Sequence, residues 1–138
     1  MIRTLVAALG FWVIAGMSAA ADEPPKVFDL SCDQTSGPAV DHHPRYWFDM
    51  NTRLWCQTDC QISDFMPLQV TPDELVLLDK SEQSGNIISA HRVTVDRRTL
   101  ILTNTVIFQS EYVSKNTSSS TWQCAIARYS GPGSTPLL

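Results

Sequence analysis

The chain has 138 residues, with 14 acidic and 10 basic side chains and a formal net charge of −4. This length predicts one domain with a core of modest size. The basic residues are scattered, and only Arg97 and Arg98 are adjacent. The sequence therefore has no positive stripe to bind nucleic acid or an anionic membrane surface.

The first 21 residues predict an export signal. Arg3 gives a positive start, residues 5–17 are strongly apolar, and the small residues Ala19 and Ala21 precede an acidic, proline-rich stretch. These features are typical of a secretory signal peptide, with the cut after Ala21. An uncleaved membrane anchor is the alternative, because the uncharged run approaches the length of a membrane span. Cleavage would leave 117 residues with a net charge of −5, outside any membrane and in the bacterial periplasm or secreted.

Short runs of β-branched and aromatic residues, separated by turn-forming residues, follow the signal. The expected strands are residues 26–31, 45–50, 53–56, 74–78, 87–95, 99–108 and 121–129. They predict an all-β fold, a small antiparallel barrel or sandwich of about seven or eight short strands. Only residues 72–80 offer a competing helix, with a start signal at Thr71. We expect a single β domain over 22–130 and a flexible, Gly/Pro/Ser-rich tail over 131–138.

The four cysteines predict two disulfides, because an exported chain of this size is oxidised. They are Cys32, Cys56, Cys60 and Cys124. Three pairings are possible. We favour Cys32–Cys124 with Cys56–Cys60, because the first bond would join the two ends of the domain.

Two segments carry a resemblance. The segment Phe28 to Cys32 ends in an early cysteine, and an aromatic strand ends in Trp55-Cys56, with Cys60 shortly after. In these features the chain resembles small exported bacterial β-proteins that have an early Cys, a Trp-Cys-x3-Cys segment and no assigned function. The resemblance implies a bacterial, exported β-protein, and it transfers no catalytic or binding residue.

The Cys56–Cys60 pair could also chelate a metal. Two thiolates four residues apart can bind copper or zinc, with His42 and His43 as further ligands. An oxidising compartment favours a disulfide instead. A redox role is disfavoured because the spacing is one residue longer than Cys-x-x-Cys.

Enzymatic chemistry finds little support in the sequence. There is no G-x-S-x-G segment, and the spacing of the available carboxylates does not show that any two of them converge. We therefore assign no catalytic residue and no cofactor.

An aromatic cluster indicates a binding surface. Strand alternation places Trp47 on the face opposite Tyr46. An exposed Trp47 beside Arg45 and Arg53, with Trp55 across a turn, would anchor a protein interface or carry a small ligand. The alternative is that both faces are covered. The resulting hypothesis is an exported, non-enzymatic binding module that recognises a protein or a small apolar ligand, with metal handling as the alternative.

Overall fold

The computed structural model of the protein describes residues 25–39, 43–57 and 60–132. The predicted signal peptide, His42 and residues 133–138 lie outside these ranges. The described strands are β1 Val27–Ser36, β2 Arg45–Asp49, β3 Leu54–Gln57, β4 Met66–Pro67, β5 Gln69–Val70, β6 Glu74–Ser84, β7 Ile87–Asp96, β8 Ile101–Gln109 and β9 Asn116–Arg128. A short 3-10 helix, η1 Ile62–Asp64, precedes β4.

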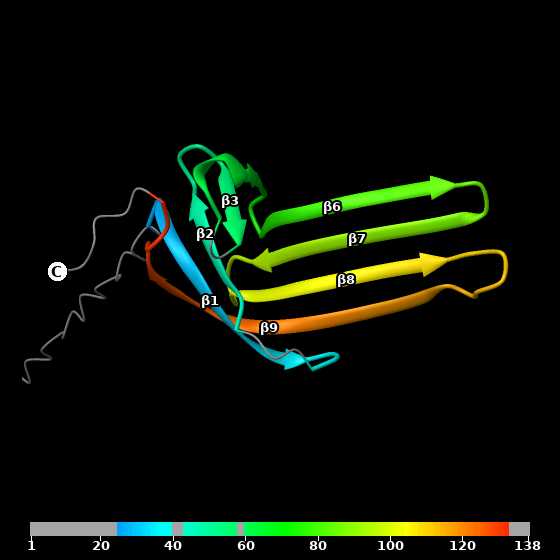
Figure 1. The fold of residues 1–138 in the computed structure, drawn as a ribbon. Coiled ribbons are helices and arrows are strands. Elements are labelled where there is room, and N and C mark those ends of the chain that lie inside the picture. The colour runs from blue at the N-terminus through cyan, green and yellow to red at the C-terminus, as the bar shows by residue number, and fades with distance from the viewer. Residues whose placement is uncertain (1–24, 40–42, 58–59, 133–138) are drawn as a thin grey trace, which may run out of the picture.

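All nine strands belong to one antiparallel sheet with the order β4-β3-β2-β1-β9-β8-β7-β6-β5. Its two outermost strands, β4 and β5, are consecutive in the chain and are separated only by Leu68. The two edges therefore meet at Leu68, and the sheet curls into a nearly closed barrel (Figure 1). The all-β prediction is confirmed, and of its two architectures the barrel is the one that forms.

The barrel core follows from strand alternation. On β1, Phe28, Leu30 and Cys32 point inward, and on β2 the buried Phe48 stacks on Phe28 with ring centroids 5.3 Å apart. Leu102 of β8 and its neighbours on β6, β7 and β9 complete the core. Successive side chains of a strand lie on opposite faces, so each strand contributes every second residue.

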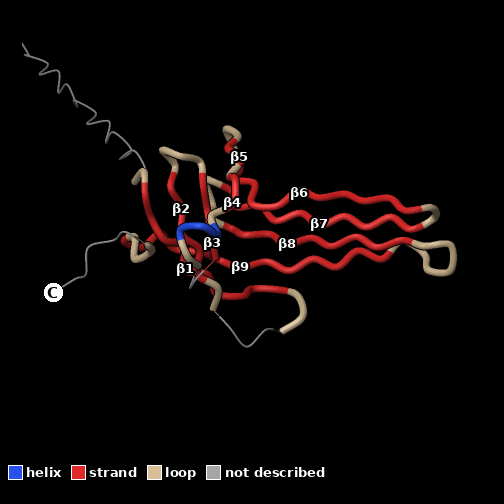
Figure 2. Tube along the Cα trace, turned by 45° about the horizontal axis from the view of Figure 1, so that its top comes forward, coloured by secondary structure: helices blue, strands red, loops and turns tan. Residues whose placement is uncertain are grey.

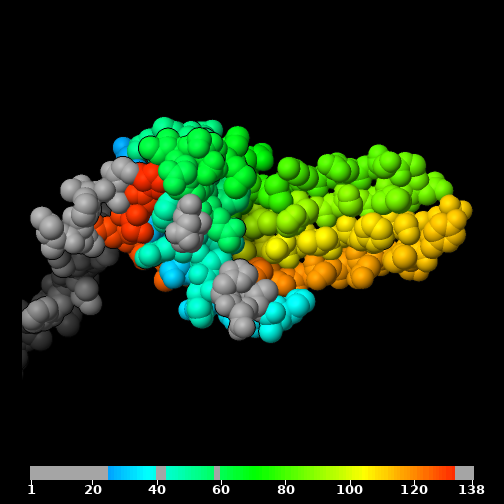
Figure 3. All heavy atoms as spheres, viewed as in Figure 1, coloured from blue at the N-terminus to red at the C-terminus, as the bar shows by residue number. Residues whose placement is uncertain are grey.

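Four strands continue beyond the barrel as an arm, which we define as residues 79–92 and 105–119. Figures 1 and 2 show β6, β7, β8 and β9 running on together, and in Figure 3 the arm projects from the rounded barrel. The pairing runs from Glu74↔Asp96 to Ser84↔Ile87 in one hairpin, with a register shift between Val76 and Leu78, and from Ile101↔Gln123 to Phe108↔Asn116 in the other. No other element covers the arm among the described residues.

Several strands are longer than predicted. Residues 72–80, where a helix was the alternative, contain the start of β6, which then continues to Ser84. The last strand begins at Asn116, five residues before its predicted start. The described part of the chain has no helix long and apolar enough to span a membrane.

Residues 129–132, which follow β9, pack on the outside of the barrel. Ser130 donates hydrogen bonds from its N–H and Oγ to the buried carboxylate of Asp29, at 3.1 and 2.7 Å. Gly131 is buried, and Tyr129 donates its hydroxyl proton to the Pro132 carbonyl at 3.0 Å. The first two residues of the predicted tail are therefore packed against the domain.

Candidate functional site

Both predicted disulfides are present. Cys32 and Cys124 lie directly opposite each other on β1 and β9, and the second bond joins Cys56 to Cys60. These bonds indicate an oxidising, exported environment.

The disulfides also leave the metal hypothesis without support. Cys56 and Cys60 bind each other, so neither offers a thiolate to copper or zinc. His43 has its Nδ1 2.6 Å from Asp33 Oδ1 at the surface, and His42 lies outside the described residues. No group of three or more metal-ligating side chains occurs in the described ranges.

The four residues of the predicted interface do not form one surface. Trp55 belongs to the barrel core, and Trp47 is on the outer face, as alternation predicted. Trp47 is only 9% exposed, because the ring of Tyr129 lies against it with centroids 6.4 Å apart. Arg45 forms an ion pair with Asp29, with its Nε 3.2 Å from Oδ2, whereas Arg53 is exposed in the turn before β3. The expectation of an exposed tryptophan is corrected: both tryptophans are buried.

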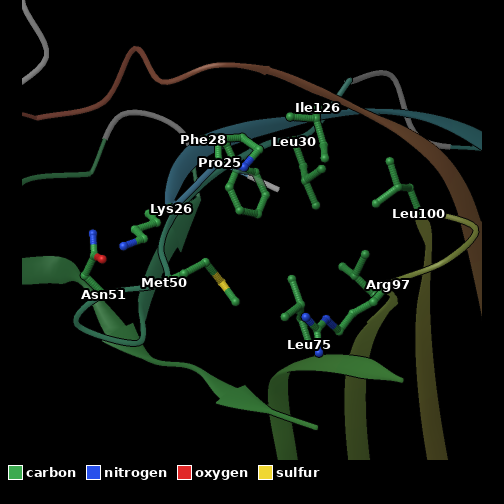
Figure 4. A pocket seen from close by; sticks show the side chains of 11 residues that line it. Pro25, Lys26, Phe28, Leu30, Met50, Asn51, Leu75, Arg97, Leu100 and Ile126 are labelled. Atoms are coloured by element: carbon green, nitrogen blue, oxygen red, sulfur yellow. The ribbon is translucent and has the colours of Figure 1, made fainter. Parts of the chain in front are cut away.

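The barrel instead opens into an apolar cavity at one end, which we call the mouth cavity. Its volume is about 300 Å³. Five segments form this end: the start of β1, the turn after β2, the start of β6, the end of β7 with the turn that follows it, and the end of β9. The lining residues are Pro25, Lys26, Phe28, Leu30, Met50, Asn51, Leu75, Val95, Arg97, Leu100 and Ile126 (Figure 4).

The inner wall of the mouth cavity is fully apolar. Phe28, Leu30, Leu75 and Val95 are all buried, and the half-buried Met50 extends its side chain across the space (Figure 4). A pocket with this lining favours an apolar ligand group, because burial removes the group from water.

The turn after β7 positions another wall residue. Asp96 Oδ1 accepts hydrogen bonds from the N–H groups of Arg98 and Thr99, both at 2.8 Å, and these bonds lower the pKa of Asp96. Leu100 adopts a left-handed φ of 56° and donates its N–H to the Asp96 carbonyl at 2.9 Å. The turn thus directs an aliphatic side chain into the mouth.

Two exposed cations border the opening. Lys26 and Arg97 lie on opposite sides of the cavity in Figure 4. Arg97 donates from Nη1 to the Thr71 and Pro72 carbonyls, at 2.8 and 3.3 Å. Neither cation forms a salt bridge with an acidic side chain within residues 25–39, 43–57 and 60–132. An otherwise acidic chain therefore presents positive charge at the entrance to its apolar cavity.

The sequence analysis placed none of these residues in a site. Each strand reads as an ordinary half-buried strand, and only closure of the barrel brings their ends together. The fold and cavity define a small disulfide-linked β-barrel with an internal ligand-sized space. A comparison with protein families, curated proteins and solved structures finds no match for this chain.

Proposed function

We propose that this protein is an exported, non-enzymatic binding protein for a small amphipathic anion. The mouth cavity supports this proposal: its wall is apolar, and the cations Lys26 and Arg97 stand at its opening. The apolar body of the ligand would occupy the cavity, and its anionic head group would remain near the surface between the two cations. Fatty acids and similar acyl anions have this chemistry.

The proposal includes a location. The predicted signal peptide over residues 1–21 and the two disulfides support export to the bacterial periplasm or the exterior. In that compartment the disulfides would persist, and the barrel would meet ligands that cells release or take up.

Calorimetric titration with dodecanoate tests the proposal, with dodecanol as the uncharged probe of equal chain length. We expect dodecanoate to bind more tightly. The Lys26→Gln and Arg97→Gln variants should each weaken dodecanoate binding about two- to fivefold, the range expected of exposed charge pairs, and should leave dodecanol binding unchanged.

Two further variants separate the site from nonspecific association. Lys80→Gln removes an exposed charge from the arm and should leave both affinities as they are. Met50→Trp places a larger ring in the cavity and should abolish binding of both probes. If the Lys80 and Lys26 variants behave alike, or if Met50→Trp binds normally, the mouth cavity is not the site.

A protein partner is the second candidate function, and the arm favours it. Ile87, Val106 and Phe108 are exposed, and the strand register puts all three on the arm face that continues the barrel interior. Exposed apolar residues gathered on one face are typical of interaction surfaces. A Phe108→Ser variant should fold normally and lose a partner that binds the arm, as measured by co-purification from the exported fraction.

A further inference from the structure

The edge of the arm that β6 forms is not covered by another strand. β5 pairs with β6 only at Leu75 and Val76, so from Leu77 to Ser84 the side of β6 that faces away from β7 pairs with no other described strand. Figures 1 and 2 show β6 running along the outer edge of the arm. An uncovered edge presents free backbone N–H and C=O groups, which can pair with a further strand.

The hairpin turn determines which residues of β6 direct these groups outward. The turn between β6 and β7 has two residues, and the residues that flank it, Ser84 and Ile87, pair with each other. In such a hairpin the flanking pair is hydrogen-bonded, and non-hydrogen-bonded and hydrogen-bonded pairs then alternate along the strands. The residues of β6 whose backbone groups face the open edge of the arm are therefore Asp79, Ser81 and Gln83.

The charges of this edge form a self-complementary pattern. Lys80 and Glu82 are exposed, and neither forms a salt bridge within the described part of the chain. When two β6 strands pair in antiparallel orientation with Ser81 opposite Ser81, Lys80 of each copy lies opposite Glu82 of the other. Asp79 then lies opposite Gln83, so the outward backbone groups of the two copies meet. The Lys80–Glu82 pairs occupy non-hydrogen-bonded positions, where opposite side chains are closest and opposite charges stabilise the pairing.

Other two-fold registers of β6 lack this match. A pairing centred on Asp79, Lys80 or Glu82 places like charges directly opposite each other, which is destabilising. A pairing centred on Gln83 forms no charge pair. The other edge of the arm offers β6 no countercharge, because residues 116–120 of β9 are only Asn, Thr and Ser. The charge pattern therefore favours one partner, a second β6, and one register.

We propose that the protein forms a two-fold symmetric dimer in which the β6 edges of two copies pair around Ser81 and join the two arms into one continuous sheet. A contact of this kind closes on itself and covers both open edges. Leu75, which lines the mouth cavity, is at the other end of β6, so the pairing leaves that cavity accessible. The dimer and the ligand site can therefore fail independently, since the oligomeric state tests one and ligand titration tests the other.

Sedimentation equilibrium of the exported protein tests the dimer. The wild type should dimerise, and Lys80→Glu should weaken dimerisation about tenfold, because it places two pairs of like charges across the interface. Adding Glu82→Lys to this variant puts opposite charges back across the interface and should restore the dimer. Lys115→Glu makes the same change of charge at an exposed position in the loop before β9, and it should leave dimerisation unchanged.

A cysteine at the two-fold axis tests the register. In the Ser81→Cys variant the two Cα atoms would lie about 5.5 Å apart, within the range of a disulfide, so mild oxidation of the folded protein should link the two copies. Gln83→Cys is the control and should remain unlinked, because Gln83 lies opposite Asp79 of the other copy.

Four results would overturn the proposal. The wild type could remain monomeric at about 0.5 mM, or it could form open-ended polymers in place of a dimer. The Lys80→Glu/Glu82→Lys variant could fail to dimerise as the wild type does. Ser81→Cys could link the copies no more readily than Gln83→Cys.

Discussion

Asp29 shows how one side chain can connect three segments of a small domain. It is fully buried on the outer face of β1, and its carboxylate accepts hydrogen bonds from Ser130 and contacts Arg45. A buried carboxylate is tolerated only when such groups compensate for its lost hydration. The residue therefore fixes the chain end and β2 against β1.

Replacing Asp29 by alanine should reduce the free energy of unfolding by about 2 kcal/mol, because Ser130 loses its hydrogen-bond acceptor and Arg45 loses its ion-pair partner. The figure stays moderate because the Arg45 side chain is 42% exposed and can be solvated. Urea denaturation measures the change. Asp33→Ala on the same strand removes a surface carboxylate that is 80% exposed, and it should change stability little. Equal losses in both variants would show that Asp29 has no special role.

Gly131 permits residues 129–132 to lie on Trp47. A Cβ atom there would come within 2.7 Å of Trp47 Cδ2 and 2.6 Å of the Tyr129 hydroxyl oxygen. We expect Gly131→Ala to displace this segment, to cost roughly 1 kcal/mol and to shift the Trp47 fluorescence toward that of a solvated indole.

Gly85→Ala is the control for that substitution. Gly85 has a φ of +57° and no atom near the added Cβ, so alanine there strains only the backbone. The Gly85→Ala substitution should lower the free energy of unfolding by a similar amount, roughly 1 kcal/mol, without a change in the Trp47 fluorescence. A fluorescence change in the Gly85 variant would show that the fluorescence does not specifically report the contact between Gly131 and Trp47.

At the scale of elements, the sequence pattern predicted the strands that alternate apolar and polar residues better than the polar ends of β6 and β9. In Arg45–Asp49 the inward Phe48 alternates with outward residues, and the alternation is visible in the sequence. In Asn116–Arg128 the first five residues are Asn, Thr and Ser, which resemble a loop. Both faces of the arm are exposed there, so no apolar residue marks one face. Pairing with β8 makes this segment a strand, and that pairing is invisible in a local pattern.

The candidate sites escaped prediction for a related reason. Trp47 and Trp55 were predicted to belong to a binding surface. Their burial, however, depends on partners that are distant in sequence, such as Tyr129 for Trp47. The mouth cavity gathers residues from five segments that only barrel closure brings together. The disulfide pairing could be anticipated because it rests on one simple consideration, the joining of the domain ends.

The turn between β7 and β8 should make stability depend on pH in acid. Hydrogen bonds from Thr99 and Arg98 lower the pKa of Asp96 below its usual value. A carboxylate with a lowered pKa in the folded state stabilises the fold above its unfolded-state pKa, and this contribution disappears as the pH falls below about 4. Asp96→Asn keeps an acceptor oxygen and removes the charge. Urea unfolding between about pH 6 and pH 2 should show a smaller acid loss in the variant, and parallel curves would contradict this origin.

At the scale of the whole molecule, two disulfides of very different span hold one barrel. Cys32–Cys124 joins residues 92 positions apart, whereas Cys56–Cys60 closes a loop of separation 4. The chain-entropy treatment assigns more stabilisation to the longer loop, because it restricts the unfolded chain more.

Replacing Cys32 and Cys124 by serine should therefore cost about 4–5 kcal/mol, and replacing Cys56 and Cys60 about 2 kcal/mol. Thermal and urea unfolding of the two double variants measure the difference. A larger loss of stability in the Cys56/Cys60 variant would contradict this treatment. It would mean that the Cys56–Cys60 bond stabilises the folded state rather than restricting the unfolded chain.

The pairing of β1 with β9 also sets an order for biosynthesis. Cys32 precedes its partner by 92 positions, and Cys56 and Cys60 are synthesised between the two. Early closure of the short Cys56–Cys60 loop would remove the two thiols that could otherwise pair wrongly with Cys32. The barrel cannot close until β9 pairs with β1 and β8. A chain truncated before Cys124 would therefore carry a free Cys32 thiol and an open sheet edge. Quality-control proteases and thiol oxidoreductases can recognise both features.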